Sequence, residues 1–255
     1  GFFRMDNNGE ATYQRNGQFQ LDRMGFIVNP TGAKLTGYTA NASGALLTGA
    51  PSPLSINTAD LTPQMTSAVN AVLNLDSRGE TPLNAFDMND PETFNSSTAV
   101  SVYDSLGNSH TLQTFYVKSA PGTWEVYASL DGGAAFSPAP STMTFDSNGV
   151  LTAGSPMTIP PQALTTGAAP LGFPIDFAGT TQFGSTFSVN TLNQDGYTSG
   201  RLAGFSIGAD GMVLGRYTNG QSAVLGQVVL ANFANPNGLQ QLGNNMWAET
   251  STSGN

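Results

Sequence analysis

The sequence contains no cysteine, few charged side chains and no long apolar run. The lack of cysteine excludes disulfides, thiolate zinc sites and cysteine nucleophiles. Charged residues make up 10% of the chain, against about 25% in typical domains, which favours an uncharged polar surface. The longest apolar runs, such as Val228-Val-Leu-Ala231, are far too short to span a bilayer, so no contact with a membrane is expected.

Basic residues are especially scarce. Eight Lys and Arg face 17 Asp and Glu, a formal net charge of −9 that argues against nucleic acid as a partner. The deficit is concentrated in residues 76–192, where ten acids oppose only Arg78 and Lys118, a formal charge of −8. The flanks together hold seven acids and six bases. This shift indicates that the middle segment is a separate domain inserted between the flanks.

Glycine and turn-forming pairs are abundant instead. Asn-Gly pairs lie at 8–9, 16–17, 148–149, 219–220 and 237–238, and Asp-Gly pairs at 131–132, 195–196 and 210–211. Such pairs favour two-residue β-hairpin turns. Over residues 2–38 the turn signals recur about every eight residues, as expected for an all-β sheet.

Alternating apolar residues predict strands along most of the chain. In the middle segment we expect strands at 99–103, 110–118, 124–130, 143–145 and 150–152, with loops over 154–180. In the flanks we expect a short strand at 54–56, a strand at 69–75 that leaves the first domain and a frayed tail from 248. At the end of the middle segment, residues 184–189 are expected to start the return strand. Helical periodicity is absent except for one possible turn after Pro236. The predicted fold class is all-β with very little helix.

Candidate catalytic residues are few. His110 is the single histidine, and we interpret it as a packing or surface residue on a strand. Gly204-Phe-Ser-Ile-Gly208 matches the nucleophile-elbow pattern, which requires a following helix and a later histidine. In this chain the turn-forming pair Asp210-Gly211 follows the match, and His110 precedes it in the sequence. The match is therefore interpreted as a chance occurrence. With 17 acids a glycosidase pair stays open, but nothing singles one out.

Candidate metal and ligand sites are equally weak. Asp6-Asn-Asn-Gly9 lacks the spaced oxygen ligands of a calcium loop, and the cluster Asp87, Asp90 and Glu92 is interpreted as a solvated acidic loop. Four aromatic residues, which could line a sugar platform or fill a core, are Tyr103, Tyr116, Trp124 and Tyr127. No phosphate loop is present. We therefore predict no catalytic, cofactor-binding or metal-binding residue, no cofactor and no enzymatic activity.

Both flanks carry a set of motifs that resembles one protein family. The matching stretches are Gly1-Phe-Phe-Arg4, Tyr13-Gln-Arg-Asn-Gly-Gln-Phe-Gln-Leu-Asp22, Gly25-Phe-Ile-Val-Asn29, Leu35-Thr-Gly-Tyr38, Gly196-Tyr197, Asn219-Gly220, Val224-Leu-Gly-Gln-Val-Val-Leu-Ala-Asn-Phe233 and Gly243-Asn-Asn-Met-Trp247. The set resembles the hook proteins of the bacterial flagellar rod/hook axial family. Val100-Ser-Val-Tyr-Asp-Ser-Leu-Gly-Asn-Ser-His110 resembles the start of that family's second domain.

The resemblance implies an inner β domain made of residues 1–75 and 193–255, and an inserted acidic outer β domain of residues 76–192. It implies a structural subunit of the hook, the flexible tube that passes torque from motor to filament outside the cell. Implied partners are copies of itself and other axial proteins of the rod, hook cap and hook–filament junction. The resemblance also implies terminal helical segments beyond this chain, so this fragment is expected to be monomeric. The protein is expected to be exported without a cleaved signal peptide. Hinges are expected near 77–82 and 193–200.

Two other interpretations remain open. A distal-rod subunit would share the flanks, whereas the fuller match through the middle segment favours hook. An extracellular carbohydrate-binding module would also be β-rich, acidic and aromatic. It would differ by a groove of exposed aromatic side chains.

Overall fold

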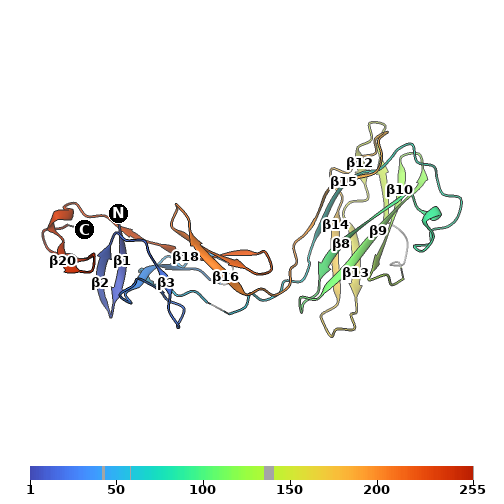
Figure 1. The fold of residues 1–255 in the computed structure, drawn as a ribbon. Helices are drawn as coiled ribbons and strands as arrows, with labels where there is room; N and C mark the ends of the chain where they lie inside the picture. Colours follow the sequence, from blue (N-terminus) through green and yellow to red (C-terminus); the bar gives the residue numbers. More distant parts are fainter. Residues whose placement is uncertain (42–43, 58, 135–140, 255) are drawn as a thin grey trace. The chain divides into compact units, whose positions relative to one another are not determined.

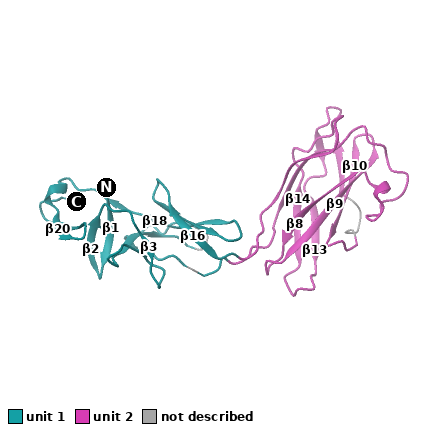
Figure 2. Cartoon of the chain, viewed as in Figure 1, with its two compact units in different colours: residues 1–61, 200–255 teal, residues 62–199 magenta. Residues whose placement is uncertain are grey.

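The computed structural model describes residues 1–41, 44–57, 59–134 and 141–254 and separates two compact units (Figure 2). Unit 1 consists of Gly1–Leu61 and Gly200–Asn255, and unit 2 of Thr62–Ser199. The described residues contain strands and two short 3-10 helices, η1 (Pro91–Thr93) and η2 (Pro236–Gly238), but no α-helix. The all-β prediction, with one unit inserted into the sequence of the other, is confirmed. In the described part of the chain no helix has the length and apolar character needed to cross a membrane.

Unit 1 is built on one sheet whose main path runs β16-β17-β18-β5-β1-β2-β21-β20. Its strands are β1 (Phe2–Asn7), β2 (Glu10–Gln14), β3 (Gln20–Leu21), β4 (Ile27–Val28), β5 (Lys34–Thr39), β6 (Ser52–Pro53), β16 (Leu202–Ile207), β17 (Met212–Tyr217), β18 (Ser222–Val228), β19 (Leu230–Ala231), β20 (Gln240–Gly243) and β21 (Met246–Ala248). Strands from the start of the chain (β5, β1 and β2) lie between two groups of strands from its end (Figure 1): β18 pairs with β5, and β21 pairs with β2. Backbone pairing therefore joins two segments that the sequence separates by more than half its length.

Two apolar clusters stabilise unit 1. The larger is made of fully buried residues including Met5, Ile27 and Leu35. The smaller is aromatic: the Phe233 ring lies edge-on to Phe2 and Tyr13, with ring centroids 5.6 and 4.8 Å apart. Because each cluster combines side chains from before and after the insertion, neither sequence half of unit 1 has a complete core alone.

Unit 2 is a β-sandwich of two sheets. The five-stranded sheet runs β12-β11-β10-β9-β8 and the four-stranded sheet β13-β14-β7-β15. The strands are β7 (Val69–Asn74), β8 (Ser96–Tyr103), β9 (Ser109–Ala120), β10 (Thr123–Leu130), β11 (Ser141–Phe145), β12 (Leu151–Ala153), β13 (Met157–Gln162), β14 (Leu171–Asp176) and β15 (Ser188–Gln194). The five strands predicted between residues 99 and 152 are confirmed as β8 to β12.

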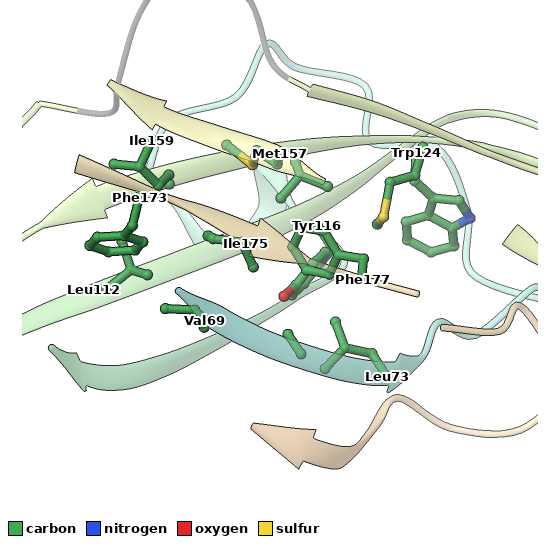
Figure 3. Packing of buried hydrophobic residues seen from close by; sticks show 14 of the residues in the cluster. Val69, Leu73, Leu112, Tyr116, Trp124, Met157, Ile159, Phe173, Ile175 and Phe177 are labelled. Atoms are coloured by element: carbon green, nitrogen blue, oxygen red, sulfur yellow. The ribbon is translucent and has the colours of Figure 1, made fainter. Parts of the chain in front are cut away.

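Apolar side chains from both sheets meet in one core between them (Figure 3). Trp124 and Tyr116 of the five-stranded sheet and Leu73 of the four-stranded sheet are at most 1% exposed. Full burial of such side chains is worth roughly 1.5–3 kcal/mol each. The alternation of apolar residues in β9, β10 and β14 places one face of each strand in this core.

Tight turns of one sequence type connect many strands. An Asp or Asn side chain accepts hydrogen bonds from backbone N–H groups two and four residues later, and a glycine with positive φ occupies the position between them. Loops of this type begin at Asp22, Asn29, Asp104 and Asp146. These contacts are local, which is why the sequence alone marks the turns.

Several sequence expectations are corrected. Residues 154–180 contain β13 and β14 instead of loops only. The tail is ordered through a turn in which Ser253 is fully buried and accepts a hydrogen bond from Asn235 N at 2.8 Å. The expected strand at 54–56 is not formed: β6 ends at Pro53, and Ser55 makes only an isolated bridge to Phe26. Asn16-Gly17 forms no hairpin, because β2 pairs with β1 and β21 and not with β3.

The predicted boundaries at residues 75 and 193 fall inside unit 2. Strand β7, assigned to the first flank from sequence, lies in the middle of the four-stranded sheet, parallel to β14 and antiparallel to β15. The segment expected to be a hinge near 77–82 is held within unit 2, since Lys118 Nζ donates to Ser77 O and Gly79 O at 2.6 and 2.9 Å. The chain passes between the units at 61–62 and 199–200.

Candidate functional site

His110 lies in a buried polar cluster of unit 2. Its side chain is 9% exposed, with Nδ1 2.6 Å from Asp131 Oδ2 and Nε2 3.3 Å from Asp104 Oδ2. Asp104 follows β8 and Asp131 follows β10, so the imidazole links the ends of two neighbouring hairpin turns. Thr166 Oγ1 donates to the same Asp104 oxygen at 3.0 Å. The cluster thus ties a loop between β13 and β14 to the five-stranded sheet.

The cluster is arranged to hold an imidazolium between two carboxylates. Burial opposes protonation of His110, but its hydrogen bonds to Asp131 and Asp104 outweigh this and raise its pKa. Burial also opposes ionisation of Asp104, yet hydrogen bonds from Asn108, His110 and Thr166 hold its pKa below the usual value. Burial acts against the charge of Asp131 as well, but the hydrogen bond from His110 lowers the pKa of that carboxyl. A buried charge is tolerated where it is paired and hydrogen-bonded in this way.

The arrangement contains no catalytic triad. Ser206 of the Gly-x-Ser-x-Gly match belongs to β16 in unit 1, and a turn, not a helix, follows it. Both ring nitrogens of His110 face carboxylates. Of the two roles that the sequence left open for His110, packing or surface, its burial supports packing.

The predicted acidic loop provides no metal centre. Asp90 caps the start of η1, and its Oδ1 accepts a hydrogen bond from Glu92 N at 3.0 Å. Asp87 Oδ1 accepts a hydrogen bond from Asn89 N at 2.9 Å. Within the described ranges no group of three or more His, Asp and Glu is placed to hold a metal ion. Asp6 Oδ1 accepts from Gly9 N in the β1–β2 hairpin turn, as the turn interpretation expects.

The four aromatic residues weighed as a sugar platform do not form one. Trp124 and Tyr116 are 1% and 0% exposed. The ring of Tyr127 is stacked on Phe86 with centroids 4.0 Å apart, and burial with a hydrogen bond to Glu125 raises its pKa to about 12. The core interpretation therefore holds for Trp124 and Tyr116, while Tyr103 and Tyr127 are half-buried.

Formal charge divides sharply between the two units. By the observed boundaries unit 1 contains six acids and six bases, so it is formally neutral. Unit 2 contains eleven acids and two bases and carries the whole formal charge of −9. Its two bases are already engaged: Arg78 pairs with Asp76 at 2.8 Å, and Lys118 binds backbone oxygens. The surface of unit 2 is therefore strongly anionic.

A groove of about 590 Å³ lies on unit 1. Its lining residues come from distant parts of the chain: Phe3, Gly17, Phe19, Ile207, Gly208, Ala209, Asp210, Gly211, Val228 and Leu230. Two of its apolar side chains, Ile207 and Leu230, are 36% and 62% exposed. Sequence analysis missed this groove because its residues share no local pattern. Only the pairing of β16, β17, β18 and β1 within one sheet brings them together.

Comparison with known proteins identifies the family. A family model described as "Flagellar hook protein FlgE/F/G D1 domain" matches residues 1–70, and one described as "Flagellar basal body protein FlaE D2 domain" matches residues 74–197. The chain is 37% identical to the flagellar hook protein FlgE of Salmonella typhimurium and 34% identical to that of Escherichia coli, over its entire length. It spans 65% of the length of each relative.

The fold is also shared with a solved structure. The crystal structure of Helicobacter pylori flagellar hook protein FlgE2 matches the whole chain and 92% of its own chain, with a TM-score of 0.70 and 16% identity. At that identity the match shows a shared fold alone. It covers both segments that the two family models match. The chain belongs to the flagellar hook protein family.

Proposed function

We propose that the protein containing this chain is the structural subunit of a flagellar hook, the flexible tube that transmits torque from motor to filament. The observation that carries the proposal is the alignment of all 255 residues with hook proteins at up to 37% identity. Its partners would be copies of itself and axial proteins of the rod, hook cap and hook–filament junction. It would act outside the cell, exported without a cleaved signal peptide, and without catalysing a reaction.

The two units suit a mechanical role. Each has its own buried core, and close-packed protein cores resist deformation. At the edge of unit 1, Leu61 and Gly200 exchange backbone hydrogen bonds of 2.7 and 3.2 Å; at the edge of unit 2, Gln64 and Tyr197 exchange bonds of 2.9 Å. We place the flexible link between these two pairs, at residues 62–63 and 198–199. It replaces the hinge expected near 77–82.

Neighbouring copies of unit 2 would repel one another through their charge of −9. Such repulsion is screened by salt within about 10 Å at 0.1 M ionic strength. Contacts that involve unit 2 in a hook are therefore expected to be wet, weak and sensitive to salt and acid, which suits surfaces that must slide and form again.

The test is complementation of a hook-gene deletion with the gene that encodes this chain. Electron micrographs should show curved tubes on the basal bodies, and swimming should return. A deletion in a distal-rod gene serves as the control and should not be rescued. Rescue of the rod deletion instead would support the distal-rod alternative, and rescue of neither would contradict an axial role.

A further inference from the structure

The turn between β8 and β9 touches both segments of the chain that lead from unit 2 to unit 1. The turn spans Asp104–Asn108, and its Gly107 has a positive φ of +84°. A Cβ on Gly107 would lie 2.7 Å from Pro63 Cβ and 3.3 Å from Thr198 Cα. This close approach is possible because glycine has no Cβ.

The contact begins where the backbone pairing of these two segments ends. Gln64 and Tyr197 exchange backbone hydrogen bonds of 2.9 Å, and Pro63 and Thr198 are the next residues along each segment toward unit 1. Proline has no N–H group with which to continue such pairing. At Pro63, packing against Gly107 therefore takes the place of a backbone hydrogen bond.

The β8–β9 turn is itself held from two sides. The carboxylate of Asp104 is fully buried, and its Oδ2 lies 3.3 Å from His110 Nε2 of β9. From the loop between β13 and β14, Thr166 Oγ1 donates to the same oxygen at 3.0 Å, and Ala169 N donates to Ser105 Oγ at 2.9 Å. The turn is thus fixed to both sheets of the sandwich, because β9 belongs to one sheet and β13 and β14 to the other.

We propose that the β8–β9 turn is a brace that limits the movement of the link at Pro63 and Thr198, and that Thr166 holds this brace in place. A turn supported by its own hairpin alone would yield when the link pressed against it. This turn passes the force to both sheets of a close-packed core, which resists deformation. The inference rests on the position of the link given under the proposed function, and it adds a stop on one side of that link.

The absence of cysteine allows one spin label to be placed on each unit. Ser147→Cys, in the turn after β11, and Ser206→Cys, on β16, are exposed sites of unit 2 and unit 1 outside the brace. Pulsed electron paramagnetic resonance on the 255-residue chain measures the distribution of distances between the labels. Gly107→Ala should shift the peak of this distribution, because the link must retreat by about 1 Å before the added Cβ reaches an ordinary contact of about 3.5–4.0 Å.

Gly179→Ala is the matched control. Gly179 lies in the turn after β14 and also has a positive φ, +87°, but a Cβ there would lie 3.7 Å from the nearest atom, a methyl carbon of Val72. The control therefore carries similar backbone strain without a collision, and it should leave the peak in place. An equal shift in Gly107→Ala and Gly179→Ala would overturn the proposal, as would an unmoved peak in folded Gly107→Ala.

A second variant tests the brace from its other side, and it decides the matter should Gly107→Ala fail to fold. Thr166→Val removes the hydroxyl that donates to Asp104, so the turn should yield more easily and the distance distribution should broaden. Circular dichroism checks that the fold is unchanged. An unchanged width in folded Thr166→Val would overturn the role of Thr166 and of the brace. Complementation of a hook-gene deletion by the unaltered gene is scored separately, so the hook function can stand while the brace fails.

Discussion

His110 Nδ1 lies 2.6 Å from Asp131 Oδ2, and this pair connects the start of β9 to the turn that follows β10. Asp104, whose side chain is fully buried, closes the other side of the same imidazole. The finding gives unit 2 one cluster whose charge depends on protonation of an imidazole, because His110 is the single histidine of the chain.

Stability of unit 2 should therefore fall as the pH rises. The folded-state pKa of His110 is raised above its unfolded value, so its contribution is complete below about pH 6.5 and is lost as the pH passes through the folded pKa. We expect the free energy of unfolding to be larger at mildly acidic than at mildly alkaline pH by on the order of 1 kcal/mol. Denaturant titrations at a mildly acidic and a mildly alkaline pH measure this difference in the free energy of unfolding. In His110→Gln the difference should vanish; a variant that keeps the full pH dependence would refute the assignment.

The buried hydroxyl of Thr12 gives a prediction for unit 1. Thr12 is 0% exposed, and its Oγ1 is without a hydrogen-bond partner in the described part of the chain. Thr12→Val keeps the shape and removes the unpaired group, so stability should rise by about 1 kcal/mol. Thr36→Val is the matched control. The Thr36 hydroxyl donates to Arg4 O at 2.9 Å, and its loss should destabilise by a similar amount. Melting temperatures that move in the same direction for both variants would contradict this reasoning.

Local features of the fold were predictable from sequence. The Asp or Asn turns depend on side chains and glycines within five residues of one another. Strands β8 to β12 could be predicted because apolar and polar residues alternate along them in the sequence. Strands β13 and β14 were missed because Pro160, Pro161 and Pro174 signal loops. Strand β13 is an edge strand, where a missing N–H is tolerated. Pro174 precedes Ile175, where the pairing of β14 with β7 begins.

Long-range features were not predictable. The alternation in β7 shows that it is a strand but not which sheet it joins, and its parallel partner β14 lies about a hundred residues later. Likewise the spacing of Asp104, His110 and Asp131 gives no sign that the three side chains meet. The charge shift located the inserted segment, since charge is a property of composition, but it could not fix the boundary because residues 62–75 contain no charge.

The position of β7 leads to a test with two fragments. Residues 62–199 contain both sheets of unit 2 and should fold alone, with a cooperative thermal transition and near-ultraviolet dichroism from the buried Trp124. Residues 76–192, the boundaries expected from sequence, lack β7, and the core loses Val69, Ala71, Leu73 and Leu75. Three of these side chains are large and contribute about 2 kcal/mol or more each, so their loss alone is comparable to the stability of a marginally stable domain, and the pairing of a central strand is lost as well. A cooperative transition in the shorter fragment would show that unit 2 does not depend on β7.

Alanine substitutions at two glycines of unit 1 distinguish the cost of a steric clash from the cost of backbone strain. Gly25 and Gly32 both have positive φ, +82° and +88°, in turns of the same type. A Cβ on Gly25 would lie 2.6 Å from Ile56 O, whereas a Cβ on Gly32 meets nothing within 4 Å. Gly32→Ala should thus cost only the strain of the left-handed conformation, roughly 1 kcal/mol. Gly25→Ala must also displace the backbone at Ile56, whose N donates to Gly25 O at 2.7 Å.

We therefore expect Gly25→Ala to lower the free energy of unfolding by roughly 3 kcal/mol or more. Denaturant titration of both variants beside the unaltered chain measures the difference. Because Ile56 belongs to the same apolar cluster as Ile27 and Leu35, the damage should spread to the core, and amide hydrogen exchange in β4 and β5 should accelerate in Gly25→Ala but not in Gly32→Ala. Equal losses in the two variants would mean that the chain at Ile56 yields freely, and that its contact with the turn at residues 22–25 does not hold this part of unit 1 together.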